Sequence, residues 1–203
     1  MLLLLTTMTI GVLLASGVAL GVSQKFSNPS TILIPPVGTA DPYPSEITVA
    51  AMPSTIRDVN LHLKGYRHIF PDDVGVLLVG PTGQSALVMS DVGGNIDVVG
   101  LRLILDDEAT TSLPDNAQIT DDPINRYKPT QGTTSTTGPL DNPVPVPFPP
   151  PAPAPPPGGD YGTTLSVFDG TNPNGVWKLY VLDDTDELKG KFARGWALRI
   201  NAS

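Results

Sequence analysis

The fold is decided by residues 174–184, which read NGVWKLYVLDD. Trp177, Leu179 and Val181 occupy alternate positions, with the polar Lys178 between the first two. An Asn-Gly turn sequence precedes the run and two aspartates end it. Period-two alternation bounded by turn residues is typical of a half-buried strand in an antiparallel sheet.

The same pattern recurs along the chain, with Gly-, Pro- and Asp-rich turns between the segments. We expect strands at Glu46–Met52, Arg57–Leu63, Val74–Val79, Ala86–Met89, Val98–Asp106, Thr163–Phe168, Val176–Asp183 and Ala193–Asn201. No segment has a sustained helical period. The sequence therefore predicts an all-β protein, built as a β-sandwich.

Composition narrows the possible functions. The chain has 203 residues, no cysteine and a net charge of −8, from 12 basic and 20 acidic residues. Nucleic-acid binding is excluded because it needs clustered Lys and Arg to neutralise phosphates. Without disulfides, the stability of a secreted domain must come from its apolar core or from a bound metal.

The first 22 residues are apolar or small and carry no charge. They predict a secretory signal peptide, and therefore a secreted, extracellular protein. The alternative is an uncleaved membrane anchor, because about 20 apolar residues nearly span a bilayer. We expect contact with a membrane only in that second case.

The rest of the chain is divided by its prolines. Residues 23–43 predict an extended leader, and residues 44–203 a single sandwich interrupted by a Pro-rich insertion at 128–160. An inter-domain linker is the alternative, but the strands expected after it are too few for a second sandwich. Because long structureless loops are unusual, we expect part of the insertion to pack along the sandwich surface.

Two groups of motifs resemble a known family. They are IRDVNLHL (56–63), HIFPDDV (68–74) and LLVGPTG (77–83), and then LSVFDG (165–170), NGVWKLYVLDD (174–184) and GKFARGWALRI (190–200). Together they resemble the P domain, or Homo B domain, of subtilisin-like proprotein convertases. The resemblance implies a jelly-roll β-sandwich of the galactose-binding-domain-like type. It also implies a subtilisin-like catalytic domain as the usual partner, so we expect a bacterial stand-alone form.

Catalytic motifs are missing from the sequence. The only histidines are His62, on the polar side of its expected strand, and His68, in the expected turn before Phe70. Both are predicted to be surface or turn residues. The chain has no Gly-x-Ser-x-Gly elbow, no phosphate loop and too few His and Cys ligands for zinc. The sequence therefore predicts a protein that is not an enzyme.

Aspartates that follow expected strands suggest a metal site. Asp106 and Asp107 end one strand and Asp183 ends another, so they could converge at one rim of the sandwich. Calcium binds carboxylate and loop carbonyl oxygens, and these residues predict a structural calcium ion. The alternative is that Asp merely terminates strands and caps turns.

Two functions fit these features. The first is a secreted, non-catalytic structural or interaction module, associated with proteolysis through a secreted subtilisin-like protease, or with a component of the cell envelope. The second is a carbohydrate-binding module. Trp177 and Trp196 lie on apolar faces and are expected in the core, which weakens the second. Tyr180 faces the other side and Tyr43, Tyr66, Tyr127 and Tyr161 are expected in loops, so a sugar site stays open.

Overall fold

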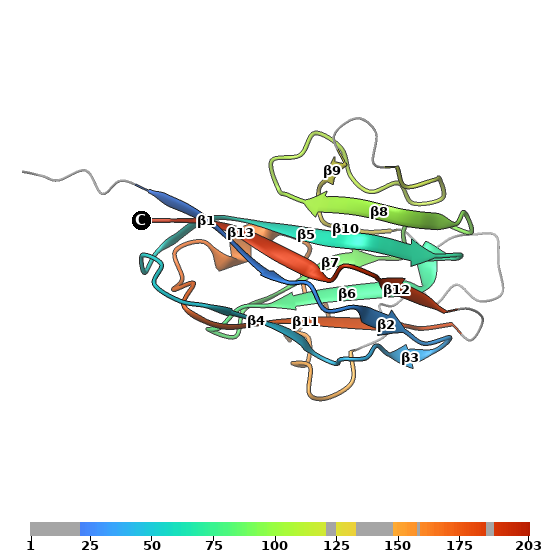
Figure 1. Ribbon diagram of the computed structural model, residues 1–203, viewed down its shortest axis with the longest axis horizontal. Coiled ribbons are helices and arrows are strands. Elements are labelled where there is room, and N and C mark those ends of the chain that lie inside the picture. Colours follow the sequence, from blue (N-terminus) through green and yellow to red (C-terminus); the bar gives the residue numbers. More distant parts are fainter. Residues whose placement is uncertain (1–20, 121–124, 133–147, 158, 186–188) are drawn as a thin grey trace, which may run out of the picture.

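In the computed structural model two β-sheets pack face to face, which confirms the predicted all-β sandwich (Figure 1). The structure describes residues 21–120, 125–132, 148–157, 159–185 and 189–203. The predicted signal peptide therefore lies almost wholly outside the described residues. Within them, no helix has the length and apolar character needed to cross a membrane. The jelly-roll connection pattern stays a prediction.

Sheet A is organised around one long strand, β5 (Ile56–His68). Its seven strands also include β1 (Val22–Asn28), β2 (Ile32–Ile34), β8 (Val98–Leu105), β9 (Arg126–Tyr127), β12 (Gly190–Phe192) and β13 (Trp196–Ala202). One edge of β5 pairs with β13 and then β12, and the other edge pairs with β8.

Sheet B is organised around β11 (Gly175–Asp183), the strand on which the sequence analysis began. It also contains β3 (Gly38–Thr39), β4 (Ser45–Val49), β6 (Val74–Val79), β7 (Ser85–Ser90) and β10 (Thr130–Gln131). The order runs β10, β7, β6, β11, with β3 and β4 on the far edge of β11. All six residues of β6 are buried, as its apolar sequence indicates.

The residues predicted as a leader belong to the sandwich. β1 pairs with β13 along its whole length, from Val22 opposite Ala202 to Asn28 opposite Trp196. β2 belongs to sheet A and β3 to sheet B. The prediction of a leader outside the domain is therefore wrong. The C-terminus consequently lies beside the start of β1 (Figure 1).

The segment predicted as a strand at Thr163–Phe168 is instead a 3-10 helix, η2 (Leu165–Phe168). Leu165 and Phe168 are buried, and the ring of Phe168 packs edge-on against Trp177 at 4.9 Å between centroids. The two buried residues are three positions apart, which fits one turn of a 3-10 helix, whereas Val167, which alternates with Leu165, is exposed. A second 3-10 turn, η1 (Pro71–Asp73), joins β5 to β6.

Both tryptophans are fully buried between the sheets, as predicted. Trp177 donates its indole hydrogen to the carbonyl of Pro173 at 2.9 Å, and Trp196 donates to Oγ of Ser45 at 2.9 Å. Tyr66, which was expected in a loop, lies in β5 and is also fully buried.

Part of the Pro-rich insertion is described, from Phe148 to Pro157, while residues 133–147 and 158 lie outside the described residues. Phe148 is buried against Leu77, Leu182 and Tyr161 on the outer face of sheet B. This confirms the expectation that part of the insertion packs along the sandwich surface.

Candidate functional site

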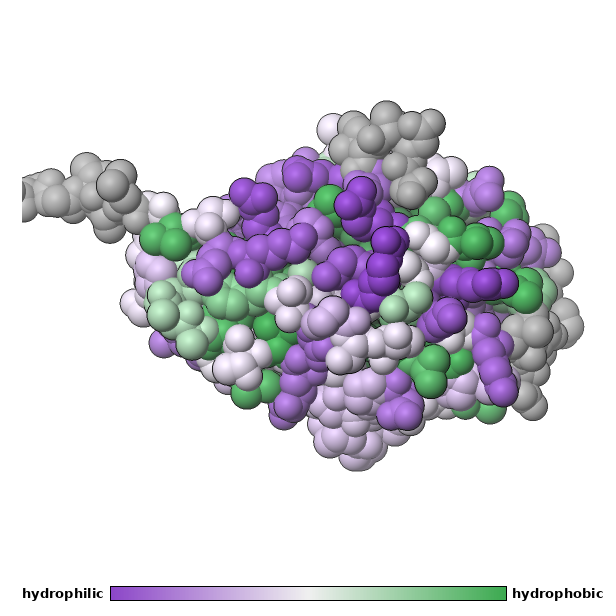
Figure 2. Space-filling model, in the orientation of Figure 1, coloured by the Kyte–Doolittle hydropathy of each residue, from purple (hydrophilic) through white to green (hydrophobic). Residues whose placement is uncertain are grey.

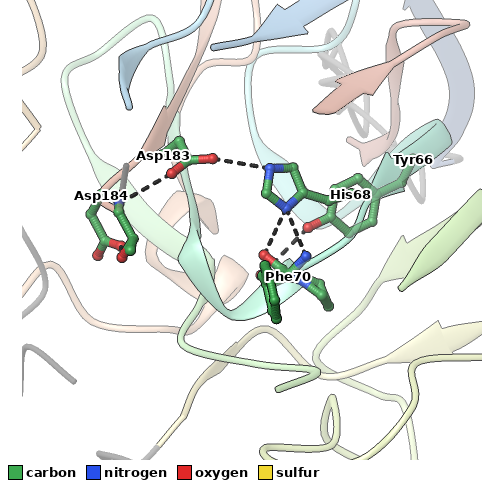
Figure 3. A network of polar contacts seen from close by, with 7 residues as sticks. Tyr66, His68, Phe70, Asp183 and Asp184 are labelled. Atoms are coloured by element: carbon green, nitrogen blue, oxygen red, sulfur yellow. Dashed lines mark hydrogen bonds and ion pairs between the residues drawn. The ribbon is translucent and has the colours of Figure 1, made fainter. Parts of the chain in front are cut away.

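A buried histidine–aspartate pair joins the two sheets at one end of the sandwich. His68 ends β5 in sheet A, and Asp183 ends β11 in sheet B. Nε2 of His68 lies 3.0 Å from Oδ2 of Asp183, and both side chains are 0% exposed (Figure 3). The prediction that His68 is a surface or turn residue is therefore wrong, because it is buried and ends a strand.

The surroundings of the His68 ring favour its doubly protonated form. Nδ1 lies 2.7 Å from the carbonyl oxygen of Phe70 and 3.2 Å from its backbone nitrogen, so the closer neighbour of each ring nitrogen is an acceptor. Burial alone lowers the pKa of His68, but the hydrogen bond and charge of Asp183 outweigh it and raise the pKa above 6.5. Because both nitrogens are engaged, neither is available to take a proton from a nucleophile.

Two further carboxyl groups lie near this pair. Burial, and then the charges of Asp183 and Asp184, raise the pKa of Asp73 to about 7. Burial also raises the pKa of Asp184 to about 6, with smaller contributions from Asp91 and Asp183. This end of the molecule therefore binds protons more tightly when folded than when unfolded.

The first prediction concerns pH. The folded pKa of Asp73 exceeds its unfolded value of 3.8, so its stabilising contribution is complete below pH 3.8 and is lost as pH rises through about 7. Asp73→Asn removes this loss. We therefore expect the free energy of unfolding of the variant, minus that of wild type, to be larger at pH 8 than at pH 4. The expected increase is on the order of 1 kcal/mol, because the side chain is partly exposed. Urea unfolding at both pH values measures it, and equal differences at the two values would contradict it.

The three aspartates predicted to bind calcium are not brought together. Asp106 follows Leu105, which pairs with Leu61 in the middle of β5, whereas Asp183 contacts His68 at the end of that strand. Seven residues of strand separate these positions, which is roughly 23 Å. In the described part of the chain no three His, Cys, Asp or Glu side chains are grouped to hold a metal ion. The predicted convergence is therefore wrong, and calcium binding itself stays a prediction.

Asp106 and Asp107 each have a structural partner. The buried carboxylate of Asp106 lies 2.8 Å from Nη1 of Arg126, and its other oxygen accepts from the backbone nitrogen of Glu108 at 2.8 Å. The two oxygens of Asp107 accept from the backbone nitrogens of Leu165 and Ser166, at 3.0 and 2.8 Å. Asp107 thus caps η2 from a distant part of the chain.

The second prediction tests this cap. Asp107→Ala leaves two backbone donors of η2 without their acceptor, so we expect a loss of about 1–2 kcal/mol in unfolding free energy. Chemical denaturation measures it. The matched control is Asp97→Ala at an exposed position, which leaves η2 capped and should cost less, and an equal loss in both variants would contradict the capping role.

A polar groove of about 640 Å³ crosses the outer face of sheet A near Asp106. Its lining includes residues from four strands or their ends, namely Asp58, Asn60 and His62 of β5, Arg199 and Asn201 of β13, Ile104 of β8 with the following Asp106, and Arg126 of β9. The alternation of β5 explains the arrangement, because Val59, Leu61 and Leu63 point into the core.

Two buried polar atoms in this groove have no hydrogen-bond partner among the described residues, Oδ1 of Asn60 and Nε2 of His62. Asn60 is only 8% exposed, and its amide nitrogen donates to Oδ2 of Asp58 at 3.0 Å, which leaves Oδ1 as an unused acceptor. Buried polar groups are nearly always paired, so two adjacent exceptions are informative.

Cations surround His62. Burial, and then the charges of Lys25, Lys64, Arg199 and Arg102, lower the pKa of His62 from 6.5 to about 4. These residues come from β1, β5, β13 and β8, whose outer faces are adjacent. The face over these strands is strongly hydrophilic (Figure 2). Asp58, Asp106 and Glu108 line the groove beside these cations, so the face carries charges of both signs, with the positive ones around His62.

Sequence reasoning placed His62 correctly on the polar side of β5 but did not identify this groove. The signal was present in the alternation of Asp58, Asn60, His62 and Lys64 along one face. The neighbours Arg102 and Arg199 depend on strand pairing that the sequence did not reveal.

Comparisons with known proteins give limited information. No protein-family model matches the chain, and no curated protein matches it. The resemblance to a P domain therefore stays a prediction.

Two solved structures are similar in shape. The serine protease of Aeromonas sobria is 14% identical with a TM-score of 0.44, over 94% of this chain and 28% of that chain. The complex of that protease with the chaperone ORF2 gives 15% identity and a TM-score of 0.43, over 90% and 27%. The present chain thus spans less than a third of the length of either match, and similarities this low assign no function.

Proposed function

We propose that the protein is a secreted, non-catalytic interaction module that binds its partner through the groove on sheet A. The observation that carries this proposal is the pair of buried atoms without partners among the described residues, Asn60 Oδ1 and His62 Nε2, in a groove lined by charges of both signs. A docked partner would supply the missing hydrogen bonds and regain the free energy that their burial costs.

The cations around His62 define one part of the partner. Lys25, Lys64, Arg102 and Arg199 attract an acidic group of the partner, while Asp58, Asp106 and Glu108 line the rest of the groove and exclude a uniformly acidic surface. The sequence resemblance makes a secreted subtilisin-like protease the proposed partner. In this role the sandwich stabilises or positions the protease, and it performs no chemistry itself.

A carbohydrate is the second candidate, because sugar hydroxyls donate hydrogen bonds that Asn60 Oδ1 lacks. The tryptophans that would make stacking platforms are both fully buried. A sugar would therefore bind through polar groups alone, which makes this candidate weaker.

Affinity capture from culture medium tests the proposal. We expect the tagged wild-type protein to retain a subtilisin-like protease, and Arg102→Glu/Arg199→Glu to retain at least about tenfold less. Lys178→Glu on sheet B is the matched control and should bind as wild type. Equal capture by all three proteins would contradict the role of this face. Retention on polysaccharide columns, lost in Asn60→Ala, would favour the second candidate.

A further inference from the structure

The outer face of sheet B is apolar and is covered by the chain's own Pro-rich segment. Leu77, Val79, Leu87, Tyr180 and Leu182 form one buried cluster there together with Phe148 and Tyr161. These sheet residues point away from the core between the sheets. An apolar surface of this kind requires a cover, and here the cover is an irregular segment that forms no strand.

Three tyrosine hydroxyls bind this segment through its proline carbonyls. Tyr43 donates to the oxygen of Pro149 at 2.9 Å, and Tyr180 donates to the oxygen of Pro151 at 3.1 Å. Tyr161 donates to the oxygen of Pro153 at 2.7 Å. The contacts thus repeat at every second residue.

The three tyrosines share one cluster, in which Tyr161 and Tyr180 are buried and against which Tyr43 packs. The rings of Tyr43 and Tyr180 meet edge-on at 5.0 Å between centroids. Burial raises the pKa of Tyr43, Tyr161 and Tyr180, so all three phenols remain donors. Proline carbonyls suit such donors, since proline has no N–H and proline-rich segments leave their carbonyls free.

Phe148 anchors the start of the segment. It is 4% exposed and meets the Tyr161 ring edge-on at 5.9 Å. Gly75 of β6 makes room for it, because a Cβ there would lie 3.2 Å from Cζ of Phe148. This surface therefore fits a segment that has an aromatic residue followed by prolines with free carbonyl groups.

We propose that this face is a docking surface for proline-rich segments of partner proteins, and that Phe148–Pro153 occupies it as an internal competitor. The contacts use backbone carbonyls and two apolar side chains of the segment, Phe148 and Ala152, so another chain with the same pattern makes them equally well. Aromatic surfaces that read proline-rich peptides are a recurring mode of recognition.

The internal segment competes strongly with a free peptide because it is tethered to the surface. A linked segment acts at an effective concentration on the order of millimolar when its linker is short. A free peptide therefore displaces the internal segment only at similar concentration, unless the internal segment is weakened. A physiological partner would need several proline-rich repeats or a second contact, such as the groove on sheet A.

Fluorescence anisotropy with a labelled peptide of residues 146–157, VPFPPPAPAPPP, tests the proposal on the full chain. We expect Phe148→Ser, which removes the anchor of the internal segment, to bind the peptide at least about tenfold more tightly than wild type. Ala152→Asp weakens the same segment independently and should behave alike, since Ala152 packs against the cluster. Failure of both variants to bind the peptide would overturn the proposal.

Adding Tyr43→Phe and Tyr180→Phe to the Phe148→Ser chain should reduce peptide affinity by about tenfold, because two hydrogen bonds are lost. Tyr127→Phe is the matched control. Tyr127 lies in β9 of the other sheet, where its hydroxyl donates to the carbonyl of Thr120, so this variant should leave the affinity unchanged. Loss of affinity in the control alone would count against the surface. Dimers of the Phe148→Ser chain that the peptide dissociates would support it, because a second copy's segment then fills the same place.

Discussion

Replacing Asp183 by Ala is expected to lower the free energy of unfolding by about 3–5 kcal/mol, because breaking a buried ion pair leaves the other charge unpaired. His68 Nε2 and Asp183 Oδ2 have no other partner among the described residues. The pair also fixes the end of β5 in one sheet to the end of β11 in the other. Urea denaturation at pH 6 measures the loss.

The controls for this prediction separate charge from packing. His68→Ala should cost a similar amount, and the double variant His68→Ala/Asp183→Ala should cost clearly less than the sum of the two. Thr185→Ala, next to the pair, keeps both charges and should cost less than either. Additive losses in the double variant would contradict a direct interaction.

The pair also predicts a direction with pH. The folded pKa of His68 is raised above 6.5, so the stability that the pair adds is complete below pH 6.5 and is lost as pH rises through the folded pKa. The cost of Asp183→Ala should therefore shrink in alkaline solution.

Trp196→Ala is expected to lower the unfolding free energy by about 3–5 kcal/mol, the range for deleting a large buried aromatic side chain. Trp196 is fully buried at the start of β13, and its indole donates to Ser45 of β4 in the facing sheet. The side chain therefore joins the two sheets both by packing and by a hydrogen bond. Thermal or urea unfolding measures the loss.

Ser45→Ala isolates the hydrogen bond. It leaves the indole in place without its acceptor and should cost about 1–2 kcal/mol. Trp196→Phe should fall between the two variants, since it keeps most of the apolar surface. A loss in Ser45→Ala as large as in Trp196→Ala would contradict the view that packing dominates.

The sandwich itself could be predicted because alternation reports burial. Val59, Leu61 and Leu63 of β5, and Trp177 and Leu179 of β11, all point inward as their spacing indicates. The residues of β1–β3 were missed because these strands are short or polar and lie among prolines. Their assignment depends on pairing with β13, β12 and β11, which local sequence does not reveal.

The burial of His68 was missed because the strand was expected to end at Leu63, and because the period of β5 shifts beyond that residue. The register against β8 is irregular around Tyr66, and Gly65 there has a φ of 72°. Beyond this bulge Tyr66 and His68 point inward, whereas the alternation that places His62 and Lys64 outward would have placed them outside. Gly65 is the sequence signal that could have indicated the change.

The calcium prediction failed in its geometry for a related reason. Asp106 follows β8 and Asp183 ends β11, but whether two strand ends meet depends on strand direction and sheet order. Both aspartates serve local roles instead, one with Arg126 and the other with His68. Alternation along the chain predicts which side chains of a strand face the core, but it does not predict which strand ends lie together.

The most direct test of the proposed binding face is the pKa of His62, measured by NMR titration of its ring protons with and without the captured partner. Alone, the ring should titrate near pH 4, because it is partly buried among four cations. An acidic partner seated in the groove should raise this pKa by at least about one unit, since an opposite charge nearby favours the protonated form. A His62 pKa and ring shifts unchanged in the complex would contradict the account.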